Sequence, residues 1–218
     1  MANRKVAIIL SGCGVYDGSE INEVVLTILS LELRNVSYQC FAPNIEQYHV
    51  IDHLKGKDIS EYRNVLVESA RIVRGNISNL MECNPDKFDA VIVPGGFGVA
   101  KNLSNFAFKG ANLEINSELL TILKEFKDRN KPAGYMCIAP VLLPSVYGSG
   151  VILTIGNDAD TISLVHEMGG VHKTANVDEV VIDQTCKVVS TPAYMLAQSV
   201  SEAYAGIDKL VEEVIKLS

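Results

Sequence analysis

Short apolar runs alternate along this chain with amphipathic segments, and this alternation limits the folds that it can adopt. Residues 6–10 (VAIIL), 90–93 (AVIV) and 133–136 (AGYM) are almost wholly apolar. Such runs are typical of strands buried on both faces of a parallel sheet. Between the first two runs, the apolar positions of residues 20–35 follow helical spacing. The pattern therefore predicts an α/β fold, with a mostly parallel central sheet between two layers of helices.

Weaker signals along the chain complete this prediction. Further strands are expected at 38–42 and 151–155, with a hairpin formed by 180–182 and 187–190. Additional helices are expected over 61–74, 117–129, 160–168 and 197–217. The chain shows no repeat, low-complexity tract or shift in composition, which indicates one domain over residues 1–218. Residues 44–85 exceed the length of a simple crossover, so we expect an elaboration there.

Charge and cysteine content exclude several classes of function. The formal net charge is -7 and no run is rich in Lys or Arg, which argues against binding nucleic acid or an anionic membrane. Five cysteines without a C-x-x-C pair indicate a reducing, cytoplasmic environment rather than a disulfide framework.

The beginning of the chain imitates a lipoprotein signal. Basic residues precede the apolar run 6–10, and Leu10-Ser11-Gly12-Cys13 resembles a cleavage box. That run is shorter than the roughly 7–15 apolar residues of a secretory core, and cleavage would remove the first predicted strand. No run reaches the roughly 20 apolar residues of a membrane span. We therefore expect a soluble, uncleaved protein.

Cys137 lies where a predicted strand meets a predicted helix. The strand is expected to end at Met136, and Pro140 fits the first turn of a helix beginning near Ala139, because proline lacks the N–H that is unpaired there. A thiol at this corner would face backbone N–H groups, whose partial positive charge favours the thiolate. We therefore interpret Cys137 as the nucleophile of a nucleophile elbow. The alternative is a small buried cysteine that only fills a strand end.

Two carboxylates begin the helix after the first strand. Glu20 and Glu23 lie where the helix dipole favours negative charge. If the strands 6–10 and 133–136 are neighbours, this helix start lies beside Cys137. A carboxyl in that pocket would have a raised pKa and could exchange a proton with the thiol. Spacing does not separate the two, because residues three apart share a helix face.

Glycines follow the predicted strand 90–93. The turn Pro94-Gly95-Gly96 can direct N–H groups toward a reacting oxygen, and with the amide of Ile138 it would form an oxyanion hole. An ordinary glycine turn is the alternative.

Cofactor and metal motifs fail in this sequence. Asp17 stands where the third glycine of a G-x-G-x-x-G fingerprint is required, and no P-loop is present. His49 and His53 have the i, i+4 spacing of metal ligands but lack a third ligand. His166 and His172 cannot be placed from sequence. We therefore expect no cofactor and no metal.

Several motifs, in order along the chain, resemble the ThiJ/PfpI superfamily of class I glutamine amidotransferase-like proteins. They are Asp17-Gly18-Ser19-Glu20-Ile21-Asn22-Glu23, Pro94-Gly95-Gly96, Ala100-Lys101-Asn102-Leu103-Ser104 and Cys137-Ile138-Ala139-Pro140. Residues 11–20 (SGCGVYDGSE) and 191–197 (TPAYMLA) are similar to the ElbB-type glyoxalases, also named enhancing-lycopene-biosynthesis proteins.

The resemblance implies a flavodoxin-like three-layer sandwich that forms a homodimer. It implies that Cys137 is the nucleophile, that Glu23 hydrogen-bonds its sulfur, and that the amides of Gly96 and Ile138 form the oxyanion pocket. Further candidates for the pocket are Glu20, Gly95 and Asn102.

Departures from the superfamily pattern narrow the expected chemistry. Ile138 stands where the superfamily's proteases have a histidine, which argues against protease or amidase activity. Tyr135 and Ala139 replace the glycines that flank the cysteine of amidotransferases, which argues against glutamine hydrolysis.

The expected function is a cofactor-independent glyoxalase that converts glyoxal or another small dicarbonyl to a hydroxy acid, with deglycation as a related activity. The alternative is a redox-sensing or interaction protein in which Cys137 is oxidised to a sulfinate that protonated Glu23 stabilises. A link to isoprenoid metabolism is suggested only by the family name.

Overall fold

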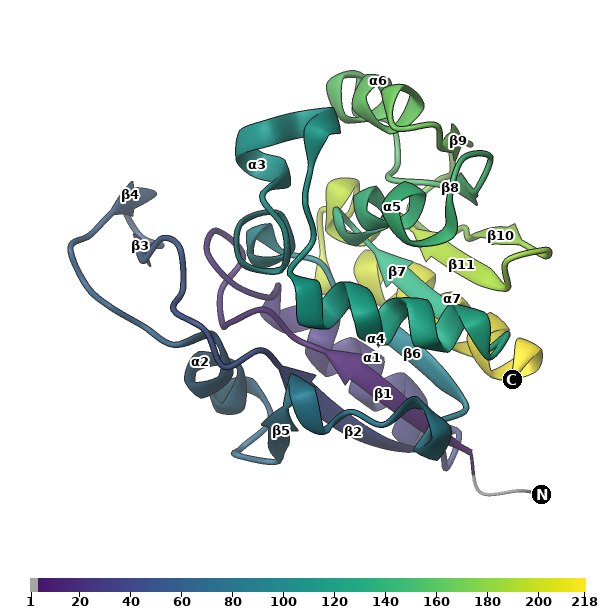
Figure 1. The fold of residues 1–218 in the computed structure, drawn as a ribbon, viewed down its shortest axis with the longest axis horizontal. Helices are drawn as coiled ribbons and strands as arrows, with labels where there is room; N and C mark the ends of the chain where they lie inside the picture. Colours follow the sequence, from purple (N-terminus) through teal and green to yellow (C-terminus); the bar gives the residue numbers. More distant parts are fainter. Residues whose placement is uncertain (1–3) are drawn as a thin grey trace.

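The computed structural model describes residues 4–218, which form a seven-stranded sheet with helices on both faces (Figure 1). The strand order is β10-β11-β7-β6-β1-β2-β5. All neighbours are parallel except β10 and β11, which pair antiparallel. The strands are β1 (Lys5–Ile9), β2 (Ser37–Ala42), β5 (Ile77–Asn79), β6 (Ala90–Val93), β7 (Ala133–Met136), β10 (Val181–Asp183) and β11 (Val188–Thr191). The predicted mostly parallel α/β sandwich is confirmed.

Two hydrophobic cores lie on opposite faces of this sheet. Side chains alternate along β1, so that Val6 and Ile8 belong to one core and Ala7 and Ile9 to the other. The first core lies beneath α1 (Ile21–Leu33), α2 (Val65–Ile72) and α7 (Val200–Leu217). The second lies beneath α4 (Ser117–Asp128) and α5 (Leu143–Tyr147), which face the viewer in Figure 1. Burial on both faces explains why β1, β6 and β7 are uniformly apolar.

Small elements complete the chain outside the main sheet. Strand β8 (Ile152–Leu153) pairs with β9 (Val171–His172) rather than with the main sheet, so the predicted strand 151–155 is much shorter than expected. The other short helices are α3 (Phe106–Lys109), α6 (Ala159–Glu167), η1 (Leu80–Glu82), η2 (Pro85–Lys87), η3 (Val99–Leu103, a π-helix), η4 (Gly110–Asn112), η5 (Ala139–Leu142) and η6 (Ala193–Met195).

Residues 44–85 contain elements of the sheet and its helix layer as well as a projecting hairpin. Their second half supplies α2 and the edge strand β5. Their first half contains the hairpin of β3 (Ile51–Asp52) and β4 (Lys57–Asp58), which stands away from the sheet in Figure 1. Strand β5 was not predicted because Ile77-Ser78-Asn79 has one apolar residue and therefore no periodicity.

Several predicted boundaries shift because of capping side chains. The helix expected over 61–74 begins at Val65, since Asn64 caps it by accepting from the N–H of Val67 at 3.1 Å. The final helix begins at Val200, where Ser199 is the cap. After Cys137 the chain first makes the 3-10 turn η5, and α5 starts only at Leu143.

Candidate active site

Cys137 lies at the carboxyl end of β7, one residue before the cap of η5. Its backbone has φ +59°, a left-handed conformation that is rare for residues other than glycine. Its N–H donates to the carbonyl of Thr191 at 3.1 Å, which ties the corner to the end of β11. The side chain is buried, with an exposed fraction of 7%. Strained backbone of this kind is concentrated at functional sites, and it holds the thiol at a fixed position above the sheet edge.

Glu23 brings a fully buried carboxyl to the same place from the first turn of α1. The N–H of Gly95 donates to its Oε2 at 2.7 Å, and the N–H of Tyr194 donates to its Oε1 at 3.2 Å. A Cβ atom at Gly95 would lie 2.8 Å from Oε2 of Glu23 and 3.0 Å from the sulfur of Cys137, so the carboxyl lies beside the thiol. Three segments distant in sequence therefore fix the carboxyl and hold it against the sulfur.

The absence of a side chain at Gly95 allows the carboxyl of Glu23 to approach the thiol. The prediction that they lie side by side assumed that the strands of residues 6–10 and 133–136 are neighbours. That assumption is wrong, because β6 lies between β1 and β7. Gly95 follows β6, and a Cβ atom there would lie 2.5 Å from the Cβ of Cys137 and 2.8 Å from Oε2 of Glu23. Glycine at this position thus lets the carboxyl and the thiol meet across the intervening strand.

Two backbone amides also affect the pKa of the sulfur. The N–H groups of Gly96 and Ile138 lower the pKa of Cys137 and so favour its thiolate. Gly96 has φ +96°, and a Cβ atom there would lie 2.3 Å from the carbonyl oxygen of Gly18. Only glycine therefore allows the loop to pass this close to the first loop and to direct its amide at the sulfur.

Burial controls the protonation of the pair. Desolvation, and to a smaller extent the charge of Glu20, raise the pKa of Glu23 to about 8. Desolvation and then the charge of Glu23 raise the pKa of the Cys137 thiol well above its ordinary value, although the two amides lower it. The backbone N–H groups favour the thiolate, as expected, but burial of the sulfur outweighs their effect on its pKa. A protonated Glu23 carries no charge to oppose the thiolate and can donate to it.

A cavity of about 360 Å³ leads to the thiol. Its lining is mostly apolar and comes from the loops after β1 and β6, from α3 and α6, and from the corners at Cys137 and η6. The lining residues are Val15, Gly96, Phe97, Ala100, Phe106, Ala107, Cys137, Ile138, Asp158, Thr161, Tyr194 and Met195. This cavity, called the inner cavity below, gives a small apolar molecule access to a buried sulfur.

Three further predicted site residues, Glu20, Gly95 and Asn102, lie around the thiol and the Glu23 carboxyl. Glu20 caps α1 by accepting from the N–H of Glu23 at 2.7 Å, so Glu23 rather than Glu20 meets the thiol. The amide of Asn102 donates to the carbonyls of Ser11 and Asp17 and holds the first loop. Glu20, Gly95 and Asn102 therefore support the site without lining the inner cavity.

The histidines lie outside the site. The ring of His166 is 3.2 Å from the carbonyl oxygen of Gly170, and the ring of His172 accepts from the N–H of Ile155 at 3.3 Å. His49 packs against Tyr48 and Phe108, whereas His53 accepts from the N–H of Tyr16. Within residues 4–218, no group of three or more His, Cys, Asp or Glu side chains is placed to hold a metal ion.

Sequence reasoning did not assign roles to the segments that close the inner cavity. Tyr194 supplies a backbone N–H to Glu23, and this residue lies in the quoted segment 191–197. Asp158 and Thr161 reach the cavity from the start of α6, where Asp158 caps the helix through the N–H of Thr161. In the sequence, a helix with its capping residue gives no indication that it borders a site.

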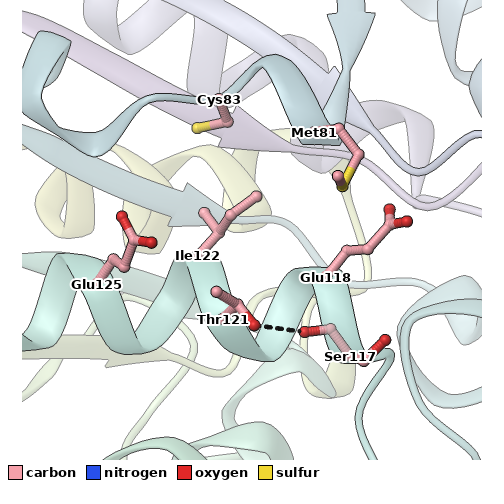
Figure 2. Close-up of a pocket in the computed structure, with 7 residues that line it drawn as sticks. All are labelled: Met81, Cys83, Ser117, Glu118, Thr121, Ile122 and Glu125. Carbon is pink, nitrogen blue, oxygen red and sulfur yellow. Dashed lines mark hydrogen bonds between the residues drawn. The ribbon is translucent and has the colours of Figure 1, made fainter.

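A second hollow of about 360 Å³ lies between η1 and α4 (Figure 2). It is lined by Met81, Cys83, Ser117, Glu118, Thr121, Ile122 and Glu125. Cys83 is buried there, and desolvation followed by the charge of Glu125 raises its pKa to about 12. This hollow, called the α4 hollow below, shares no lining residue with the inner cavity. All five cysteines are free thiols, as predicted.

Comparison with known proteins identifies the family. No family model matches the chain. The human "glutamine amidotransferase-like class 1 domain-containing protein 3, mitochondrial" is 43% identical, covering 98% of this chain and 83% of its own length. The rat "ES1 protein homolog, mitochondrial" is 44% identical over 98% of this chain and 84% of its own. This chain belongs to the ES1 family of glutamine amidotransferase-like class 1 proteins.

Solved structures agree with this family and with the predicted superfamily. An "isoprenoid biosynthesis protein with amidotransferase-like domain" from Ehrlichia chaffeensis has a TM-score of 0.92 and 39% identity, with 98% of this chain and 99% of that chain covered. Glyoxalase III from Candida albicans has a TM-score of 0.63 at 12% identity, covering 98% and 97% of the two chains. Drosophila melanogaster DJ-1beta has a TM-score of 0.55 at 17% identity, covering 99% and 95%. These last two likenesses show the shared fold.

The mitochondrial names of the ES1 relatives leave the expected cytoplasmic location a prediction. No helix in the described part of the chain is both long and apolar enough to cross a bilayer.

Proposed function

We propose that this protein is a cofactor-independent glyoxalase-type enzyme that acts on small dicarbonyl compounds through Cys137. The observation that carries the proposal is the fully buried Glu23 carboxyl beside the Cys137 sulfur at the inner end of an apolar cavity. A thiol paired with a protonated acid has both the nucleophile and the proton donor that addition to an aldehyde requires.

In the first step, the sulfur of Cys137 attacks one carbonyl carbon of glyoxal. The thiol loses its proton to solvent, and the new C–S bond forms as the C=O π bond breaks. Protonated Glu23 gives its proton to the carbonyl oxygen, which leaves a hemithioacetal and a Glu23 carboxylate that can act as a base. The amides of Gly96 and Ile138, which lower the pKa of the thiol, would also stabilise the developing negative charge on that oxygen.

In the second step, Glu23 moves a proton from the hemithioacetal carbon to the neighbouring carbonyl carbon through an enediol, while the hydroxyl proton of the hemithioacetal passes to the neighbouring oxygen. The carbon bonded to sulfur is thereby oxidised to a thioester, and its neighbour is reduced to a hydroxymethyl group. Water then cleaves the thioester, which releases glycolate and restores the thiol and the protonated Glu23. The sum is glyoxal plus water giving glycolate and a proton, so no external oxidant or cofactor is required.

The raised pKa of Glu23 suits this role. A carboxyl with a pKa of about 8 is protonated at neutral pH and lies close enough to that pH to exchange its proton in both directions. An ordinary exposed glutamate would be ionised there and would oppose the thiolate instead.

Turnover of glyoxal by the purified protein without added thiol or metal tests the proposal. We expect glycolate to form in amounts that exceed the enzyme concentration many times, and activity to be lost in the Cys137→Ser variant. Glycolate that stays below one equivalent, or equal turnover by the variant, would overturn the proposal.

A redox-sensing role is a second candidate, because the same three groups would stabilise a sulfinate on Cys137. The Glu23 carboxyl and the amides of Gly96 and Ile138 would serve as its hydrogen-bond donors. Peroxide titration with mass analysis distinguishes the roles: a stable gain of two oxygens on Cys137, together with no glyoxal turnover, would favour the sensor. A homodimer and a link to isoprenoid metabolism stay predictions.

A further inference from the structure

A further cavity of about 370 Å³, called the outer cavity below, adjoins the inner cavity. It is lined by Tyr16, Ile51, Gly56, Phe97 and Lys101. Phe97 lines both the inner and the outer cavity. The chain connects them at two further places, because Val15 and Ala100 line the inner cavity while the next residues, Tyr16 and Lys101, line the outer one.

The inner cavity alone is larger than the proposed substrate needs. Glyoxal has four non-hydrogen atoms, whereas volumes of 300–1,000 Å³ are typical of sites for ligands of drug size. The lining of the inner cavity is mostly apolar, which gives glyoxal few partners beyond the groups at Cys137. The site therefore has room for a substrate with an apolar body attached to its reacting carbonyl.

The outer cavity places a cation beside aromatic rings. The ammonium nitrogen of Lys101 is 5.4 Å from the centre of the Phe97 ring and donates to the carbonyl of Tyr16 at 2.9 Å. Within residues 4–218, no carboxylate oxygen lies within 4.0 Å of it. Asp17 and Asp58 act on Lys101 only as more distant charges. Two of its three N–H bonds are thus available to a ligand.

The backbone fixes this lysine relative to the thiol. Lys101 lies in the π-helix η3, a rare conformation that is frequent at functional sites. On either side of it, Ala100 lines the inner cavity and Asn102 is bonded to the first loop. The N–H of Phe97 donates to the carbonyl of Val15 at 2.7 Å, so the loops bearing the two aromatic rings are joined.

We propose that the outer cavity is a recognition subsite for the anionic end of the substrate, and that Lys101 determines this specificity. The inference rests on the proposed function and deepens it: the preferred substrates are 2-oxoaldehydes with an apolar or aromatic body and a carboxylate. The reacting aldehyde meets Cys137, the body crosses the apolar lining beside Phe97, and the carboxylate pairs with the ammonium group of Lys101.

The kinetic test compares phenylglyoxal with its 3- and 4-carboxylate derivatives in short initial-rate assays. We expect at least one carboxylate isomer to exceed phenylglyoxal about tenfold in kcat/KM, mostly through KM. The Lys101→Met variant should lose that preference, so that its kcat/KM for the carboxylates falls to about its value for phenylglyoxal. Lys101→Arg should keep part of it, and Lys109→Met, which removes a cation outside both cavities, should keep all of it.

A binding test separates failure of this inference from failure of the proposed function. It uses the unreactive ketones acetophenone, 3-acetylbenzoate and 4-acetylbenzoate with the Cys137→Ser variant, in which no turnover can occur. We expect one acetylbenzoate to bind about tenfold more tightly than acetophenone, and this difference to vanish when Lys101→Met is added.

The outcomes are distinct. No turnover of any dicarbonyl would overturn the proposed function, whereas the binding preference would still support the subsite. Turnover or binding without a carboxylate preference, or a preference that survives Lys101→Met, would overturn the subsite. If Lys101→Met lowered activity equally on all three substrates, Lys101 would act only by holding the Tyr16 loop, and the subsite would again be overturned.

Discussion

The inner cavity and the α4 hollow contain almost the same volume and the same reactive residue type, yet their chemistry differs. Each holds about 360 Å³ and each includes a buried cysteine, Cys137 in one and Cys83 in the other. Burial raises the pKa of both thiols. At Cys83, the charge of Glu125 raises the pKa further. At Cys137, two amides lower the pKa and a protonatable carboxyl lies beside the sulfur.

The comparison shows that a cavity and a buried thiol do not make an active site by themselves. Figure 2 shows Glu118 and Glu125 on α4, across the α4 hollow from the segment that carries Cys83, so carboxylates border this hollow. At Cys137 the carboxyl is instead fully buried and keeps its proton to higher pH. The hydrogen-bond donors, rather than the accessibility of the sulfur, distinguish the two sites.

The largest expected difference is between Cys137→Ser and Cys83→Ser. The first substitution removes the nucleophile and should lower glyoxal turnover by roughly 10³-fold or more, because a serine hydroxyl is far less nucleophilic than a thiolate. The second should leave kcat/KM within about twofold. Glycolate formation measures both, and melting temperatures check that each variant is folded. Equal losses in the two variants would remove the distinction between the cavities.

Glu23→Gln tests the proton donor with the sulfur retained. The amide side chain keeps the size of the carboxyl but cannot shuttle a proton, so we expect a loss of about 10²-fold or more in kcat. Glu20→Gln is the matched control, since it lies three residues earlier and its amide oxygen can still cap α1. It should change kcat by no more than a few-fold. A Glu23→Gln variant with full activity would exclude the proposed proton transfer.

The pH dependence of stability tests the raised pKa of Glu23 independently of activity. Its pKa is about 8 in the folded protein against about 4.5 in the unfolded chain, so the unfolded state releases its proton first as pH rises. This carboxyl therefore favours folding fully below pH 4.5, and its contribution is lost between about pH 4.5 and 8. We expect the free energy of unfolding, measured with urea, to be lower at pH 8 than at pH 5. This difference should be larger in the wild type than in Glu23→Gln by on the order of 3 kcal/mol. An identical pH dependence in the two proteins would contradict a buried, protonated Glu23.

Gly95→Ala tests the contact across β6. The new methyl group would collide with Cys137 and Glu23 and should cost about 1–3 kcal/mol of stability together with about tenfold in kcat/KM. Gly170→Ala is the matched control, because its Cβ would lie 2.8 Å from a methyl group of Val165, away from the site. It should lose stability but keep the activity of the folded fraction. If both variants kept full activity, the separation of thiol and carboxyl would not depend on Gly95.

Much of this molecule could be predicted because its strongest signals are local. The apolar runs at residues 6–10, 90–93 and 133–136 report burial on both sheet faces, and all three are strands of the central sheet. The edge strand β5 and the β3–β4 hairpin were missed, since they are short and their residues are only partly buried or exposed. Their pairing depends on contacts with other segments, which the hydrophobic periodicity of a short stretch does not reveal.

The reasoning that brought the candidate site residues together was partly wrong. Cys137 and the two glutamates were identified from their positions at element ends, yet β1 and β7 are not neighbours. What brings Glu23 to Cys137 is the glycine at position 95, and its importance depends on a strand order that sequence does not state. The role of Lys101 also required the structure, because a single lysine in a loop is ordinarily a solvated surface group.

The most direct test of the central claim is the pH dependence of iodoacetamide labelling at each of the five cysteines, resolved by peptide mass spectrometry. Because Cys137 and Glu23 are buried side by side and affect each other's pKa, their first proton should be lost with an apparent pKa that belongs to the pair, near 8. We predict that Cys137 labels faster than Cys83 from pH 7 to 9 with an inflection near that value, and that Glu23→Gln moves the inflection. Labelling of Cys137 no faster than that of Cys83, or a profile unchanged by Glu23→Gln, would contradict the account.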